Sequence, residues 1–125
     1  MNIREIYIKK FFSILTNKEK NEIYFDQYMW HAFSYEKVEC KKNDEAVEAL
    51  GKLISNEVYI IFQKHGEVLE AKNITFDKIV KKIKSNVWES DCYIIDKKFK
   101  WTFVFTHETC IDNSFYIGPF FCEIS

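Results

Sequence analysis

Reactive side chains crowd together near the carboxyl end of the chain, in the segment from Thr106 to Cys110. His107 and Cys110 lie three positions apart there, and a histidine beside a thiol can activate it as a nucleophile. Glu108 adds a carboxylate, and the segment follows the alternating aromatic residues of a predicted strand over 100–106. One hypothesis is therefore a small hydrolase-like enzyme whose catalytic site lies at the end of that strand.

His31, beside Trp30, is a fourth candidate for catalysis. Together with His107 and Glu108 it could offer two imidazoles and a carboxylate to a metal ion, but most of the chain separates His31 from the other two. Neighbouring residues in a strand point to opposite faces, so His107 and Glu108 do not converge unless the chain turns. We therefore expect His107 to be a structural residue, hydrogen-bonded to the chain around Gly118, and we predict neither a metal nor a cofactor.

The usual signatures of enzymes and of nucleic-acid binders are missing or weak. The sequence contains no Gly-rich phosphate loop, no G-x-S-x-G motif and no H-E-x-x-H motif. Lysines alternate with apolar and aromatic residues in 81–84 and 97–101, a mixture that single-strand binders use. The rings there fit a core-facing pattern, however, and the net charge of -1 does not attract a polyanion. We do not expect nucleic acid as a partner.

Cysteine spacing and hydropathy indicate the cellular compartment of the protein and whether it crosses a membrane. None of the cysteines forms a C-x-x-C pair or a short Cys–His zinc pattern. The amino terminus has no apolar run before a small-residue cleavage site, and no run of about 18 apolar residues occurs. We therefore expect a cytoplasmic protein with free thiols that does not cross a membrane. The cysteines are Cys40, Cys92, Cys110 and Cys122.

Apolar periodicity and capping residues predict the helices. Residues 3–15 carry apolar side chains at helical spacing, and the capping box of Thr16 with Glu19 predicts a second helix from Asn17. Two further helices are predicted over 44–54, with Asn43 as N-cap, and over 76–87, with Thr75 as N-cap.

The remaining apolar segments have the length and composition of strands. Segment 58–63 and segment 68–71 flank a turn and should form a hairpin. Strands interspersed with helices predict the α+β class: one domain over 1–125, with a mainly antiparallel sheet of about five or six strands and helices packed on one face. The predicted extended segments are 30–38, 58–63, 68–71, 91–95, 100–106 and 115–123.

Strict alternation in the 100–106 strand predicts which residues it buries. Trp101, Phe103 and Phe105 fall on one face of the strand. We expect these rings to pack against the apolar stripe of the helix that carries Ile79 and Ile83.

Three stretches together resemble a known family: Trp30-His31-Ala32-Phe33-Ser34-Tyr35, the strand from Trp101 to Glu108, and Gly118-Pro119-Phe120-Phe121. The chain is similar, over 28–121, to the small bacterial proteins of the domain-of-unknown-function family 4275 (DUF4275). The resemblance implies a compact cytosolic domain and no particular activity. It implies that the following residues belong to the shared pattern: Trp30, His31, Trp101, Thr106, His107, Glu108, Gly118 and Pro119.

Without a catalytic signature, a small single domain is most consistent with binding. The leading hypothesis is a non-enzymatic protein-binding domain, of the immunity or antitoxin type, that neutralises a protein partner. Exposed aromatic residues would supply affinity, and the acidic residues near the carboxyl end could meet a basic surface of the partner. The predicted binding residues are Trp30, His31, His107, Glu108 and Asp112.

Overall fold

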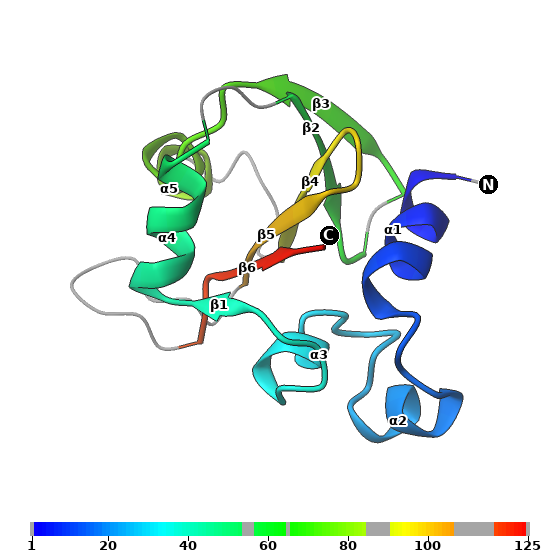
Figure 1. The fold of residues 1–125 in the computed structure, drawn as a ribbon. Helices are drawn as coiled ribbons and strands as arrows, with labels where there is room; N and C mark the ends of the chain where they lie inside the picture. The colour runs from blue at the N-terminus through cyan, green and yellow to red at the C-terminus, as the bar shows by residue number, and fades with distance from the viewer. Residues whose placement is uncertain (1, 54–56, 65, 85–90, 107–116, 125) are drawn as a thin grey trace.

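A computed structural model describes residues 2–53, 57–64, 66–84, 91–106 and 117–124. Its strands form one antiparallel sheet in the order β1-β6-β5-β4-β2-β3 (Figure 1). The sheet confirms the predicted α+β class and the hairpin of β2 with β3, and the strands β4, β5 and β6 form an antiparallel meander. The strands are β1 (Lys41–Lys42), β2 (Glu57–Phe62), β3 (Val68–Lys72), β4 (Cys92–Asp96), β5 (Trp101–Phe105) and β6 (Phe120–Glu123).

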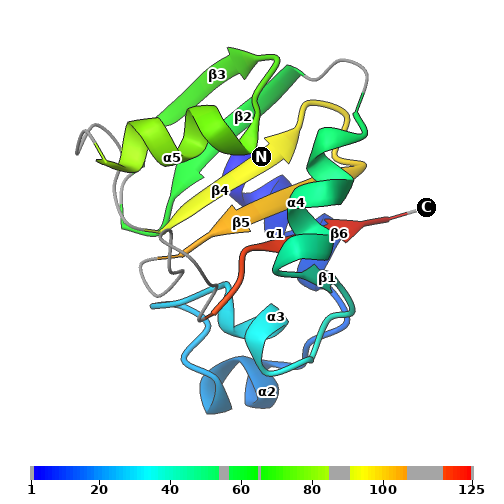
Figure 2. The same cartoon turned by 90° about the vertical axis from the view of Figure 1, so that its left-hand side faces the viewer.

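Helices cover both faces of this sheet, so the expectation of helices on one face was wrong. In Figures 1 and 2 the helices α1 to α3 lie on one side of the sheet and α4 and α5 on the other. Every residue of β5 is buried, because a central strand covered on both sides has no face exposed to solvent. The helices are α1 (Ile3–Phe12), α2 (Asn17–Glu22), α3 (His31–Ser34), α4 (Asp44–Gly51) and α5 (Phe76–Lys84).

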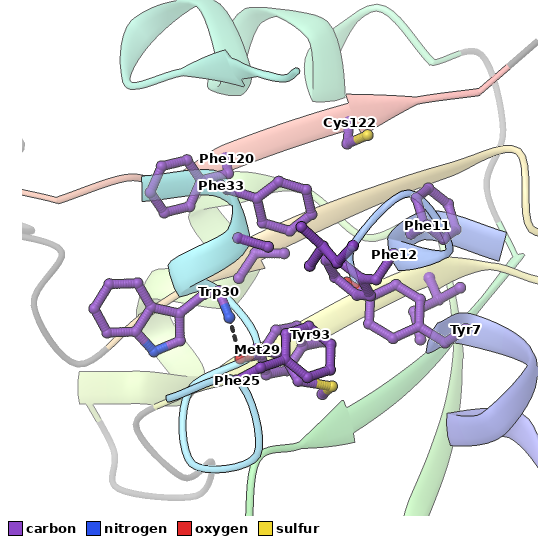
Figure 3. Close-up of a cluster of buried hydrophobic side chains, with 14 of the residues drawn as sticks. Tyr7, Phe11, Phe12, Phe25, Met29, Trp30, Phe33, Tyr93, Phe120 and Cys122 are labelled. Carbon is purple, nitrogen blue, oxygen red and sulfur yellow. Dashed lines mark hydrogen bonds between the residues drawn. The ribbon is translucent and has the colours of Figure 1, made fainter. Parts of the chain in front are cut away.

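Each face of the sheet has its own apolar core. The first core joins α1, α3 and residues that flank α2 with the strand residues Tyr93, Val104 and Phe120, and Figure 3 shows its rings packed against the sheet. The second core joins α4 and α5 with strand residues such as Ile94 and Phe103. Alternate residues along each central strand therefore serve different cores.

The second core contains the predicted face of β5. Trp101, Phe103 and Phe105 belong to it together with Ile79 of α5. The Phe76 ring of α5 contacts both the Phe103 and the Phe105 ring, each at 6.2 Å between centroids. The predicted packing of these rings against α5 is confirmed for Ile79, while the Ile83 side chain lies outside the described residues.

The capping predictions succeeded where the side chain itself makes the bond. Thr16 Oγ1 accepts from the Glu19 amide, and the Glu19 carboxylate accepts from the Thr16 amide, each at 3.1 Å. The Lys78 amide donates to Thr75 Oγ1 at 3.3 Å. Asn43 precedes α4 as predicted, but its side chain makes no capping bond and its φ is 57°. Helix α4 ends at Gly51, and residue 54 of the predicted helix lies outside the described residues.

The prediction of an extended segment over 30–38 was wrong, because residues 31–34 form α3. The helix ends in a Schellman arrangement: the Lys37 amide donates to the Ala32 carbonyl at 2.9 Å and the Glu36 amide to the Phe33 carbonyl at 3.1 Å. Glu36 occupies the left-handed position, with φ 58°, where glycine is usual. Without that glycine, the sequence carried no stop signal for a helix, and its alternating aromatic residues were read as a strand.

Candidate functional site

A cavity of about 520 Å³ lies beside α3 and next to strands β1 and β6, on the face of the sheet that carries the first core. Three stretches of the chain line it, within 28–35, 42–43 and 117–120. Its polar lining side chains are Ser34, Lys42 and Asn43, and its aromatic ones are Tyr28, Trp30, His31, Tyr35 and Phe120. The predominance of rings with a few polar groups is typical of a binding pocket.

His31 is in ring contact with three of its aromatic neighbours. Its ring centroid lies 4.4 Å from that of Trp30, 4.9 Å from that of Tyr28 and 5.0 Å from that of Tyr35. Tyr28, His31 and Tyr35 follow the spacing i, i+3 and i+7, which places them on one side of a helical segment. The helical conformation of α3 therefore brings these rings together in one wall of the cavity. An extended strand over 30–38 would have held them apart.

The hydrogen bond of the His31 ring decides its tautomer. Nδ1 lies 2.6 Å from the Ile23 carbonyl oxygen, just after α2. A carbonyl only accepts hydrogen bonds, so Nδ1 carries the proton and donates it. The neutral ring then has its lone pair on Nε2. His31 can therefore offer an acceptor or a base to a ligand without giving up the bond that orients it.

Trp30 is held by a buried polar group of β4. Its amide donates to the Tyr93 hydroxyl oxygen at 2.9 Å (Figure 3), and the Tyr93 hydroxyl donates to Gln63 Oε1. The same Gln63 oxygen accepts from the Met29 amide at 2.9 Å, and Gln63 Nε2 donates to the Asp26 carbonyl at 3.3 Å. Burial raises the pKa of Tyr93 well above its usual range. Tyr93 therefore remains a donor, and it fixes the irregular stretch before α3 to the sheet.

Lys42 supplies a positive charge to the cavity wall. It lies opposite Phe120 in the β1–β6 ladder, and its ammonium is 2.9 Å from the Glu36 carboxylate. The hydrogen bond and charge of Lys42 lower the pKa of Glu36. Because Glu36 is exposed, this ion pair is weak, and the ammonium remains available to a second anion.

The structure brings two of the predicted site residues together. Trp30 and His31 both line the cavity, although Trp30 is only 2% exposed and so is not the exposed binding residue that we expected. The other candidates lie outside the described residues: His107, Glu108, Cys110 and Asp112. Thr106 and Ile117, on either side of that segment, are joined by a 3.5 Å hydrogen bond from the Thr106 hydroxyl to the Ile117 carbonyl.

Sequence reasoning missed the cavity residues Tyr28, Tyr35, Lys42 and Phe120. The helical spacing of Tyr28, His31 and Tyr35 was a usable signal, but it was obscured by the strand prediction for 30–38. No local signal indicated Lys42 or Phe120, because they reach the cavity through the pairing of β1 with β6.

The same described residues also bear on metal binding and on membrane insertion. Within them, no three His, Cys, Asp or Glu side chains are placed to hold a metal ion. None of the described helices has the length and apolar character needed to cross a membrane. Cys40, Cys92 and Cys122 are free thiols, while Cys110 lies outside the described residues.

Comparison with known proteins yields one match. No curated protein and no solved structure matches the chain. Residues 1–121 match the family described as Domain of unknown function (DUF4275). This match covers almost the whole chain, including both sides of the cavity, so the chain belongs to the DUF4275 family.

Proposed function

We propose that this protein is a non-enzymatic, cytoplasmic binding domain of the immunity or antitoxin type, which neutralises a protein partner by accepting one of its side chains in the aromatic cavity. The observation that supports this proposal is the set of ring contacts around His31 at the mouth of the cavity. Tyr35 forms part of that mouth and is 57% exposed. Exposed tyrosines and pre-formed pockets are the usual anchors of protein interfaces.

The lining favours an aromatic side chain of the partner, next to a carboxylate. Rings prefer to pack edge-on or offset against other rings, and the cavity volume falls within the range of about 300–1,000 Å³ usual for ligand pockets. Among the described lining residues, Lys42 carries the only permanent charge. The positive charge of Lys42 would repel a quaternary ammonium ligand of the kind that aromatic cages bind, whereas it would attract a carboxylate.

Capture from a native lysate with matched variants tests the binding proposal. Tyr35→Ala removes a ring from the cavity mouth, and Tyr24→Ala removes an exposed ring that does not line the cavity. We expect the wild-type chain and Tyr24→Ala to retain the same stoichiometric partner, and Tyr35→Ala to lose it while keeping its unfolding midpoint. Equal retention by all three folded proteins would contradict the proposed docking site.

Small probes test the chemistry of the cavity independently of any partner. We expect N-acetyltryptophan to shift the NMR signals of Trp30 and Lys42, and its amide analogue to bind several-fold more weakly. Lys42→Ala should remove the preference for the acid, because it removes the attracting charge. If choline bound more tightly than N-acetyltryptophan, the aromatic–carboxylate specificity would be wrong, even if Tyr35→Ala still abolished partner capture.

The alternative proposal is a small hydrolase-like enzyme that uses His31 with His107, Glu108 and Cys110. It is supported by the orientation of His31, since a carbonyl-bound Nδ1 leaves Nε2 as a base. His31→Asn keeps a donor near the position of Nδ1 but removes Nε2, whereas His31→Gln places an amide near Nε2. Hydrolytic activity that is lost in His31→Asn, with partner capture retained, would favour the enzyme over the binding domain.

A further inference from the structure

The pairing of β1 with β6 places two cysteines opposite each other. The ladder pairs Lys41 with Phe121 and Lys42 with Phe120. Each step along one antiparallel strand is matched by a step in the opposite direction along its partner. One further step, just before β1, therefore brings Cys40 opposite Cys122.

The hydrogen bonds of the ladder identify the type of this pair. The Asn43 amide donates to the Pro119 carbonyl at 2.9 Å, so that pair is of the hydrogen-bonded type. Hydrogen-bonded and non-hydrogen-bonded pairs alternate along an antiparallel ladder. The pair of Cys40 with Cys122 lies three steps from that of Asn43 with Pro119, so it is of the non-hydrogen-bonded type. Cα atoms in such a pair lie about 4.5 Å apart, within the roughly 4.4–6.8 Å that a disulfide spans.

Both thiols lie on the same face of the sheet. Cys122 belongs to the first core, where Figure 3 shows it beyond Phe120 on the same strand, and Cys40 packs against that core. Phe121, between Phe120 and Cys122, belongs to the second core. Cys92 also belongs to the second core, so it is on the wrong face to compete for either thiol.

We propose that Cys40 and Cys122 form a dithiol site that is converted to a cross-strand disulfide by a low-molecular-weight disulfide. In the first step the Cys40 sulfur attacks the reagent RS–SR, forms a mixed disulfide and releases one RSH. In the second step the Cys122 sulfur attacks the Cys40 sulfur and releases a second RSH. Two thiols lose two electrons and two protons, and the reagent gains them as two RSH.

The surroundings of the two thiols make this reaction slow at neutral pH. Burial raises the pKa of Cys40 to about 12 and that of Cys122 to about 11. Thiolates are the attacking species, so the rate should rise about tenfold for each pH unit from about pH 7 to 9. The charged and titratable groups that interact with the pair, besides the thiols themselves, are Lys42, Glu36, Glu39, Glu123 and, from α1, the buried Tyr7.

The bond would join two strands that also form the cavity wall. Lys42 and Phe120, the next non-hydrogen-bonded pair along the ladder, both line the cavity. Oxidation would therefore tie the segment that links α3 with β1 to the central sheet. This inference depends on strand register alone and stands whether or not the cavity binds a protein partner.

The test treats the full-length reduced protein with oxidised glutathione and maps the cysteines by peptide mass spectrometry. We expect a Cys40–Cys122 crosslink, a rate that increases with pH as above, and a higher melting temperature for the oxidised chain. Cys122→Ala should stop the reaction at a glutathione adduct on Cys40, with no gain in melting temperature. Cys40→Ala, the matched variant, should form neither the adduct nor the crosslink at Cys122.

Three outcomes would overturn the proposal. The first is a stable glutathione adduct on Cys40 of the wild-type chain, because the second thiol would then be out of reach. The second is a bond from either residue to Cys92 or Cys110. The third is no reaction of Cys40 and Cys122 at about pH 9 in a chain that remains folded.

Discussion

The two faces of the sheet are built in different ways. The face covered by α4 and α5 is held by periodic apolar packing, such as Phe103 and Phe105 against Phe76. The face covered by α1 to α3 is also apolar, but long-range hydrogen bonds run through it. The Tyr7 hydroxyl donates to Thr102 Oγ1 at 3.0 Å, since the Thr102 hydroxyl itself donates to the Ile94 carbonyl at 2.8 Å.

This difference matches the position of the candidate site. Periodic packing of regular elements fills space and supports the sheet. The irregular stretch before α3 instead depends on Tyr93 and Gln63, which accept hydrogen bonds from its backbone amides and are hydrogen-bonded to each other. The aromatic cavity lies beside this stretch. The face that is harder to predict from local sequence patterns is therefore the one that holds the cavity.

The largest effect is expected from a substitution in the second core, on the face of the sheet covered by α4 and α5. Phe103 is fully buried in the second core, so Phe103→Ala should lower the free energy of unfolding by about 3–5 kcal/mol through lost contacts and a residual cavity. Urea unfolding measures this. The shifts caused by N-acetyltryptophan should persist wherever the variant is folded, because Phe103 does not line the binding cavity. An unchanged unfolding midpoint would contradict the packing of β5 against α5.

An intermediate effect is expected from the polar network of the first face. Tyr93→Phe removes the acceptor used by the Trp30 amide and the donor to Gln63. The loss of a buried partner should lower stability by about 1–3 kcal/mol and speed amide exchange at Met29 and Trp30. Tyr59→Phe, at a half-buried tyrosine of β2, is the control and should change stability by less than about 0.5 kcal/mol. Both tyrosines belong to the first core, so equal effects would mean that the hydrogen bonds of the Tyr93 hydroxyl do not stabilise this face.

The smallest effect concerns the pH dependence of the α2 cap. Backbone and hydroxyl bonds from Thr16 lower the pKa of Glu19, so the folded state favours the carboxylate. Its contribution is present above the unfolded pKa of about 4.3 and is lost as pH falls through the lower folded value. The wild-type chain should therefore lose slightly more stability below about pH 4.5 than Glu19→Gln, as measured by urea unfolding at several pH values. Parallel pH profiles would contradict the lowered pKa.

Local patterns in the sequence determined the regular part of this protein. Apolar periodicity identified α1 and α5, the Thr16 and Glu19 pair identified the start of α2, and strand alternation identified which rings of β5 share a face. These features depend on residues close together in the chain, so the physical causes of the structure are visible in a short window. The same windows pointed to Trp30 and His31 as site residues, and both do line the cavity.

Tertiary structure alone decided the shape of the site. Helix α3 ends with Glu36 in a position where glycine is usual, and it is held by Tyr93, which lies 63 residues beyond Trp30. Lys42 meets Phe120 only because β1 pairs with β6, and the inferred position of Cys40 opposite Cys122 follows from the same register. Such contacts join residues far apart in the chain, and they form because burial and hydrogen bonding across the sheet outweigh the local preference for an extended segment.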